Sequence, residues 1–79
     1  MILTVNGKVE ALVPAELSVT ALLDELRVKQ AMYVSVELNG GFLDRKAFDT
    51  TVVRDGDRVE FLYFMGGGGR VEALQHHAY

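Results

Sequence analysis

The chain has 79 residues, 49% of them hydrophobic, and its formal net charge is −3 with charges of both signs interspersed. This length suits one small domain, near the lower limit at which a hydrophobic core holds without disulfides or metals. The absence of cysteine excludes disulfides, thiolate catalysis and cysteine-based zinc sites, and the charge balance argues against nucleic-acid binding. With no signal-peptide pattern and no apolar stretch of about 18 residues, we expect a cytoplasmic domain without a membrane span.

The first predicted element is a β-hairpin. Two short β-favouring runs, residues 2–5 and 8–13, flank Asn6 and Gly7. An Asn-Gly pair between such runs favours a type I′ turn, because both central positions need a positive φ. Pro14 ends the second run, since proline cannot donate a ladder hydrogen bond.

A helix is predicted next, beginning after Ser18. Ser18 is a good N-cap because its hydroxyl can accept a hydrogen bond from the first helical turn. The spacing of the apolar residues that follow places them on one face of a helix, which we expect to fray through residues 29–30. This stripe is assigned to the core rather than to a cofactor site, and its members are Val19, Leu22, Leu23 and Leu26.

The second half of the chain predicts further strands joined by turns. Residues 34–38 alternate between apolar and polar side chains, which is typical of a half-buried strand. A turn at Gly40 and Gly41 follows. The later predicted segments are a short extended piece at 42–43, one helical turn within 44–49, an extended run at 51–53 and a last strand at 58–65.

Asp55, Gly56 and Asp57 predict a turn before the last strand. Aspartate side chains bond nearby backbone N–H groups, and glycine adopts the positive φ that such a turn requires. A calcium loop would need further oxygen ligands and a terminal glutamate, which the spacing here does not provide, so we expect no metal. One helix with an apolar stripe and these strands predict an α+β domain in which a sheet covers the helix.

The last predicted strand ends in an aromatic run that is followed at once by four glycines. Glycine has no side chain to pack and loses more backbone entropy on ordering than any other residue. We therefore expect a domain over residues 1–65, a flexible arm over 66–69 and a disordered extension over 70–79. The adjacent His76 and His77 are a weak metal signal and are more often simply solvated.

The order of these elements resembles the ThiS family of sulfur carriers in thiamin thiazole synthesis. The resemblance rests on the hairpin at Asn6 and Gly7, the helix capped by Ser18, and the 55–57 turn that leads into an aromatic strand and Gly-Gly. It covers residues 1–69, and its specificity comes from order and spacing rather than from one motif. It implies a ubiquitin-like β-grasp fold, with a mixed sheet of four to five strands and one main helix packed on one face.

The resemblance also implies a chemistry. In this family a partner adenylating enzyme uses ATP to activate the carboxylate of a terminal glycine, sulfur displaces AMP to give a thiocarboxylate, and thiazole synthase accepts the sulfur. Carried over to this chain, the reacting terminus is Gly68 or Gly69, and the flexible arm includes Gly66 and Gly67. The carrier would be a macromolecular substrate rather than an enzyme, with no catalytic residue, no bound cofactor and no metal.

Residues 70–79 depart from the family pattern, because a glycine inside a peptide bond has no free carboxylate. Three interpretations stay open. A peptidase removes the tail, the tail is a sequence artefact or frame difference, or it is a genuine tail on a carrier that has lost the chemistry.

Strand alternation predicts the surface that binds the partner. In the last strand, Val59 and Phe61 match the core set of Leu3 and Val5, so they should face the helix. Exposed apolar surface on the opposite face usually marks a binding site. The alternative is that loops shelter part of this face. The residues that we expect to bind the partner are Ile2, Glu60, Leu62, Phe64 and Met65.

Other functions fit the same sequence features. A MoaD-like or other thiocarboxylate carrier would need the same Gly-Gly and the same apolar face. A ubiquitin-like modifier would be conjugated to protein lysines, and a non-catalytic β-grasp interaction module would use the face alone. Nucleic acid and membrane are not expected partners.

Overall fold

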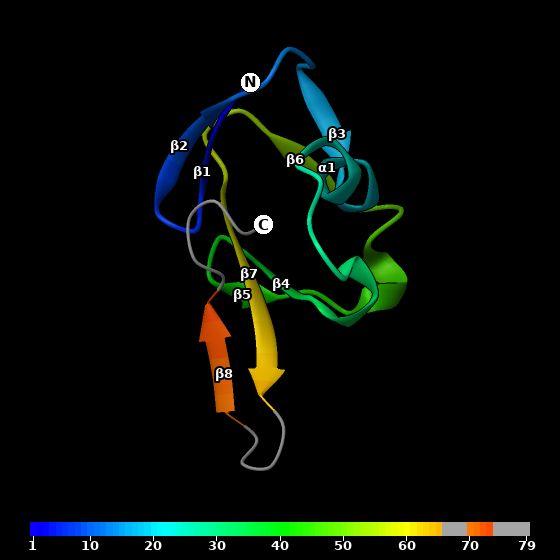
Figure 1. Ribbon diagram of the computed structural model, residues 1–79. Helices are drawn as coiled ribbons and strands as arrows, with labels where there is room; N and C mark the ends of the chain where they lie inside the picture. Colours follow the sequence, from blue (N-terminus) through cyan, green and yellow to red (C-terminus); the bar gives the residue numbers. More distant parts are fainter. Residues whose placement is uncertain (66–69, 74–79) are drawn as a thin grey trace.

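The computed structural model describes the backbone of residues 1–65 and 70–73 and the side chains of residues 1–63 (Figure 1). The helical elements are α1 (Val19–Glu25) and two 3-10 turns, η1 (Ala31–Tyr33) and η2 (Arg45–Ala47). The strands are β1 (Ile2–Val5), β2 (Lys8–Ala11), β3 (Glu16–Ser18), β4 (Ser35–Leu38), β5 (Gly41–Phe42), β6 (Val52–Arg54), β7 (Arg58–Met65) and β8 (Arg70–Ala73).

The main sheet has the strand order β2-β1-β7-β4-β5, and β8 also pairs with β7. β1 and β7 run parallel, with Thr4 beside Arg58 and Val5 beside Val59, and the other neighbouring strands are antiparallel. β7, the last strand within residues 1–65, therefore lies beside β1, the first strand. The sheet is mixed and α1 lies on one side of it, which confirms the predicted α+β class (Figure 1).

The two Asn-Gly pairs form the hairpin turns. Asn6 and Gly7 have φ values of 50° and 81°, which confirms the predicted turn between β1 and β2. Asn39 and Gly40 adopt 50° and 91° between β4 and β5. The second turn therefore lies one residue earlier than the predicted Gly40-Gly41 position, because asparagine tolerates the left-handed region well enough to take the first central site.

α1 begins as predicted and ends earlier. The hydroxyl of Ser18 accepts a hydrogen bond from the backbone N–H of Ala21 at 3.0 Å. The helix stops at Glu25 rather than near residue 30, because Arg27 adopts a φ of 53°. The Arg27 N–H then bonds to the Asp24 carbonyl and the Val28 N–H to the Leu23 carbonyl, both at 3.0 Å, which closes the helix with a Schellman motif.

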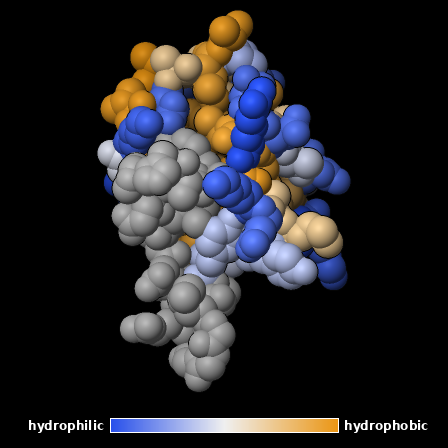
Figure 2. Space-filling model, viewed as in Figure 1, coloured by the Kyte–Doolittle hydropathy of each residue, from blue (hydrophilic) through white to orange (hydrophobic). Residues whose placement is uncertain are grey.

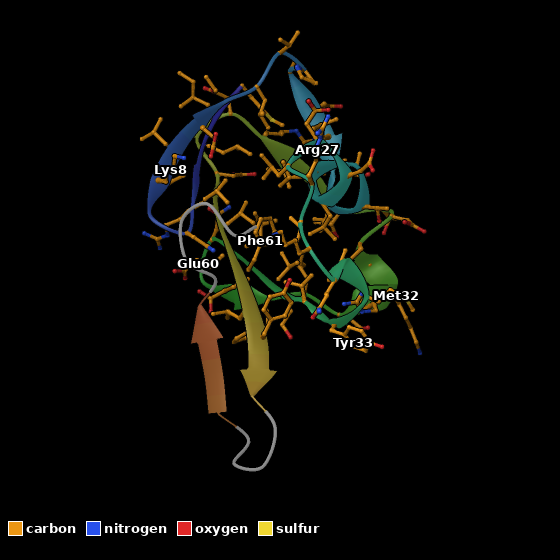
Figure 3. All side chains as sticks on the ribbon, in the orientation of Figure 1. Lys8, Arg27, Met32, Tyr33, Glu60 and Phe61 are labelled. Carbon is orange, nitrogen blue, oxygen red and sulfur yellow. The ribbon has the colours of Figure 1, made fainter. Side chains whose placement is uncertain are left out.

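The core lies between the main sheet and α1. Figure 3 shows Phe61 on the side of β7 that faces α1, and the predicted core residues of β1 and β7 are all buried there. Of the predicted helix stripe, Leu26 is only half-buried. The buried apolar residues are Leu3, Val5, Val19, Leu22, Leu23, Val28, Val34, Val36, Phe48, Val53, Val59 and Phe61.

The turn at 55–57 uses its carboxylates as predicted. Gly56 adopts a φ of 88°. The Asp57 carboxylate accepts from the backbone N–H of Arg54 at 2.9 Å, and the Asp55 carboxylate accepts from the Ile2 N–H at 2.6 Å. The Asp57 carboxylate therefore stabilises the turn itself, and the Asp55 carboxylate holds it against β1.

β3 and β6 form a second sheet of two strands, and the strand character of β3 was not predicted. Glu16 lies beside Arg54 in this pair, and an ion pair joins their side chains at 3.4 Å. A strand of three residues shows no readable period, and its partner lies more than 30 residues away. Only the tertiary structure brings the two together.

Residues 70–73 form a strand where disorder was predicted. Of the residues in β7, only Arg58 and Val59 pair with β1. The later half of β7 therefore has an open edge on the side of β1. β8 pairs along this edge, from Leu62 to Met65. An open strand edge offers unpaired N–H and C=O groups, which explains why a following segment adds to it. The predictions for residues 66–69 and 74–79 lie outside the described residues. In the part that is described, no helix is both long and apolar enough to cross a membrane.

Candidate functional site

The face of the main sheet opposite α1 is the predicted partner-binding face. The register between strands shows which residues lie on this face, because residues directly opposite each other in neighbouring strands share a face. Val36 pairs with the buried Phe61, so the next pair along the two strands, Glu37 with Glu60, lies on the open face. Figure 3 shows Glu60 and Phe61 on opposite sides of β7.

The predicted face residues are not one contiguous apolar patch. Ile2 is 55% exposed, and Leu62 and Glu60 are half-buried. Thr4, rather than Ile2, lies beside Arg58, so Ile2 and Leu62 are roughly 20 Å apart along the strand direction at about 3.3 Å per residue. Polar residues lie between them, so Ile2 and Leu62 do not belong to one apolar patch.

Phe64 and Met65 complete the predicted partner-binding set. Their backbone lies in β7, and Phe64 is beside Val71 in the pairing with β8. Their side chains lie outside the described residues, as do the four predicted arm and terminal residues Gly66–Gly69 and the histidines His76 and His77. Binding through any of these residues stays a prediction.

Three residues of the open face escaped the sequence reasoning. Val9, on β2, lies beside Thr4 of β1 and is 68% exposed. Phe42, on β5, lies beside Glu37 of β4 and is 62% exposed. Glu37 itself is the third. The Asn-Gly hairpin turns could have paired Val9 with Thr4 and Phe42 with Glu37, but only the structure sets β4 beside β7.

Another exposed apolar residue lies off this face. Val13 is 100% exposed in the connection between β2 and β3. Figure 2 shows apolar surface gathered towards the top of the view and mainly polar surface over the right-hand side. Exposed apolar residues are thus spread over more than one part of the molecule.

The Glu37 and Glu60 carboxyl groups interact directly. A hydrogen bond to Glu60, then loss of hydration and repulsion by the Glu60 charge, raises the pKa of Glu37 above its ordinary value of 4.5. Arg58 lowers this pKa by a smaller effect. Two carboxylates directly opposite in neighbouring strands repel each other once both are ionised.

Tyr63, on the covered side of β7, connects the strand to the segment after α1. Its hydroxyl donates a hydrogen bond to the backbone carbonyl of Lys29. Loss of hydration raises the pKa of the Tyr63 phenol above its ordinary value of 10.0. This contact anchors the C-terminal half of β7.

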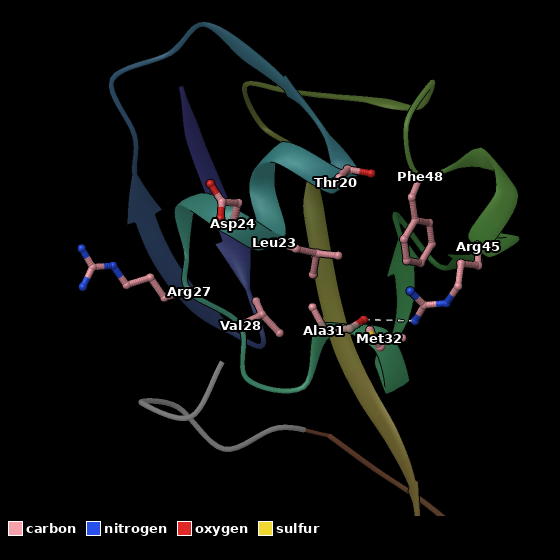
Figure 4. A pocket seen from close by; sticks show the side chains of 9 residues that line it. All are labelled: Thr20, Leu23, Asp24, Arg27, Val28, Ala31, Met32, Arg45 and Phe48. Carbon is pink, nitrogen blue, oxygen red and sulfur yellow. Dashed lines mark hydrogen bonds between the residues drawn. The ribbon is translucent and has the colours of Figure 1, made fainter.

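A shallow groove of ≈ 560 Å³ lies on the helix side of the domain, between α1, η1 and η2 (Figure 4). The Arg45 guanidinium crosses one end, where it donates to the carbonyls of Ala31 at 3.2 Å and Val34 at 2.6 Å. It also lies 4.9 Å from the centroid of the Phe48 ring. The guanidinium therefore holds η1 and η2 together. The lining residues are Thr20, Leu23, Asp24, Arg27, Val28, Ala31, Met32, Arg45 and Phe48.

Within the residues that the structure describes, no group of three His, Cys, Asp or Glu side chains could hold a metal ion. The open face instead combines large exposed apolar groups with charged ones. This combination is typical of surfaces that bind other proteins.

The mixed sheet, with β1 and β7 parallel at its centre and one helix on one face, is a ubiquitin-like β-grasp fold. A family model for the ThiS family matches residues 3–68. The chain belongs to the ThiS family.

Two solved structures of one bacterial protein are similar to this chain. The crystal structure of a thiamine biosynthesis protein (ThiS) from Geobacter metallireducens is 62% identical, with a TM-score of 0.82, and the match covers 86% of this chain and 100% of that one. An NMR structure of a thiamine biosynthesis protein from the same organism is 59% identical, with a TM-score of 0.70, over 100% of this chain and 97% of that one.

A longer curated relative also matches. It is a thiazole synthase from Paramagnetospirillum magneticum, 38% identical over 68 residues, which are 86% of this chain and 20% of the relative. The chain therefore spans about a fifth of the length of this relative.

Proposed function

We propose that the chain is a sulfur carrier protein of thiamine biosynthesis. The observation that carries this proposal is its membership of the ThiS family, together with 62% identity to a protein named for thiamine biosynthesis. The β-grasp domain would present its C-terminal glycines to successive partners. Its own side chains would do no chemistry, so the chain would act as a substrate of other proteins and not as an enzyme.

The proposed reactive group is a thiocarboxylate on a terminal glycine. An adenylating enzyme joins the glycine carboxylate to AMP from ATP and releases pyrophosphate. The terminal sulfur of a persulfide then displaces AMP to give an acyl disulfide, and a thiol reduces its S–S bond to leave the thiocarboxylate on the glycine. Glycines suit this role because a backbone without Cβ can enter a narrow channel and come close to the reacting groups. The family match ends at residue 68, which favours Gly68 over Gly69 as the terminus.

Thiazole synthase is the proposed acceptor of the sulfur. A segment similar to this chain makes up 20% of a thiazole synthase from Paramagnetospirillum magneticum. A carrier and a synthase in one polypeptide work at high effective concentration, which supports a direct contact between the two as separate chains. ATP would be used by the adenylating partner, and the cytoplasmic location expected from the sequence stays a prediction.

We also propose that a peptidase removes residues 70–79 before the chemistry begins. A carboxylate becomes available at Gly68 or Gly69 only when the following peptide bond is cleaved.

Mass spectrometry of three forms tests the proposal. The full chain and chains ending at Gly68 and at Gly69 are each incubated with ATP, a sulfur source and the adenylating enzyme of the same organism. At least one truncated form should gain roughly 16 Da, as expected when one oxygen is replaced by sulfur through an activated intermediate. The full chain should gain nothing. If the enzyme modifies its other carriers but neither truncated form, the glycines are a linker and the carrier function is wrong.

A further inference from the structure

The centre of the open sheet face places two like charges side by side. Glu37 on β4 and Glu60 on β7 are direct partners in an antiparallel pair, and both strands are interior to the main sheet. Identical charges directly opposite each other destabilise a sheet. The isolated domain gains nothing from this arrangement at neutral pH, so the pair calls for another explanation.

The groups around the pair do not neutralise it. Phe42 lies beside Glu37 on β5, and Leu62 and Ser35 form the next pair along β7 and β4. Arg58 precedes Glu60 on the same face, and its effect on Glu37 is weaker than the opposing influence of Glu60. On β2, which is farther from the pair, the Lys8 ammonium lies 3.8 Å from Glu10. Among the described neighbours of the pair, Arg58 therefore supplies the positive charge, and it offsets the repulsion between Glu37 and Glu60 only in part.

We propose that Glu37 and Glu60 together bind an arginine or lysine side chain of the protein that docks on this face. A guanidinium can bond to two carboxylates at once through its planar set of donors. The partner cation would replace the repulsion between the carboxylates with attraction. Phe42 and Leu62 would supply the apolar contacts on either side. This inference rests on the proposed function only for the identity of the partner.

The proposal predicts opposite effects on stability and on docking. Glu37→Gln and Glu60→Gln keep the shape of the side chain and remove one of the two like charges. Each should raise the thermal unfolding midpoint of the free chain by about 1–4 °C at neutral pH. Each should also weaken docking by about tenfold and reduce its dependence on salt. A purely structural role for the pair would not increase stability while weakening docking.

Calorimetric titration of the full chain with the adenylating enzyme and the thiazole synthase of the same genome tests this. Glu25→Gln is the matched control, because it removes one negative charge from the exposed end of α1. We expect the control to bind either enzyme within about twofold of the wild type, since it changes only the long-range field. The double variant should lose less than the product of the two single effects, because both carboxylates bind one cation.

Several outcomes overturn the inference. These are equal binding by the wild type and the Glu37→Gln and Glu60→Gln variants, equal loss in Glu25→Gln, or no binding of the wild type to either enzyme. Sulfur loading of truncated chains separates this inference from the proposed function. If the truncated chains are loaded normally and binding does not depend on the two carboxylates, only the inference about Glu37 and Glu60 is wrong. If binding depends on the two carboxylates but the truncated chains gain no sulfur, only the proposed sulfur-carrier function is wrong.

Discussion

The two faces of the main sheet differ in what their residues contribute. On the covered face, Val59 and Phe61 are fully buried against α1 and the apolar residues of neighbouring strands. On the open face, Glu60 and Leu62 alternate with them and are half-buried. The covered face therefore supplies most of the stability, whereas the open face keeps charges that lower it. This difference agrees with the proposal that the open face binds a partner.

The largest expected effect is at Phe61. Phe61→Ala should lower the free energy of unfolding by about 3–5 kcal/mol, because it leaves a cavity in the core. Leu62→Ala, one residue further on the open face, should cost about 1 kcal/mol. Urea denaturation of both variants measures the contrast. Similar losses for the two would mean that the open face is packed as tightly as the core.

Leu62→Asp should affect docking rather than folding. The charged side chain lies on the open face, where it should cost the fold about 1 kcal/mol and weaken binding to the adenylating enzyme by at least about tenfold. Val13→Asp is the control, because Val13 is apolar and 100% exposed but lies off this face. Binding is measured by titration calorimetry. If Leu62→Asp binds as tightly as Val13→Asp, the partner docks elsewhere.

A smaller effect is expected at the end of α1, the helix that covers the core. Arg27→Gly should stabilise the chain by about 0.5–1 kcal/mol, because glycine adopts the left-handed conformation of Arg27 without a steric penalty. Lys29→Gly, at a position without a positive φ, should instead destabilise it. Thermal unfolding of the pair measures both changes. A loss of stability in Arg27→Gly would show that the arginine side chain contributes more than its backbone conformation costs.

The smallest expected effect is a pH dependence on the open face. The pKa of Glu37 is raised above 4.5 in the folded state. At pH values just above 4.5, the folded chain therefore binds more protons than the unfolded chain. Stability attributable to Glu37 should therefore fall as the pH rises through its raised pKa. The advantage of Glu37→Gln over the wild type should be present at neutral pH and absent below 4.5. Chemical denaturation of both forms across this range measures it, and a constant difference would exclude repulsion as the cause.

Part of the fold follows from the sequence because its causes are local. Positive φ at Asn6 and Gly7, capping by the Ser18 hydroxyl and the turn at 55–57 each depend on residues within a few positions of one another. The alternation in β7 likewise identified Phe61 as a core residue, since burial on one face follows the period of the strand.

Other features required the tertiary structure, because they join segments that are distant in sequence. α1 ends at Glu25 because Val28 turns back into the core, and nothing in the local sequence near Arg27 signals this. β3 forms only because β6 lies beside it.

The candidate site shows the same division. The sequence by itself identified the strand that carries the open face and the glycines that follow it, because alternation and the loss of side chains are visible in one segment. It could not place Ile2 far from Leu62 or Glu37 beside Glu60, since both relations depend on the register between strands. Register is decided when the whole sheet packs on its core, and a shift of one residue would reverse the faces of a strand. The tertiary structure therefore decided which charges the partner would meet.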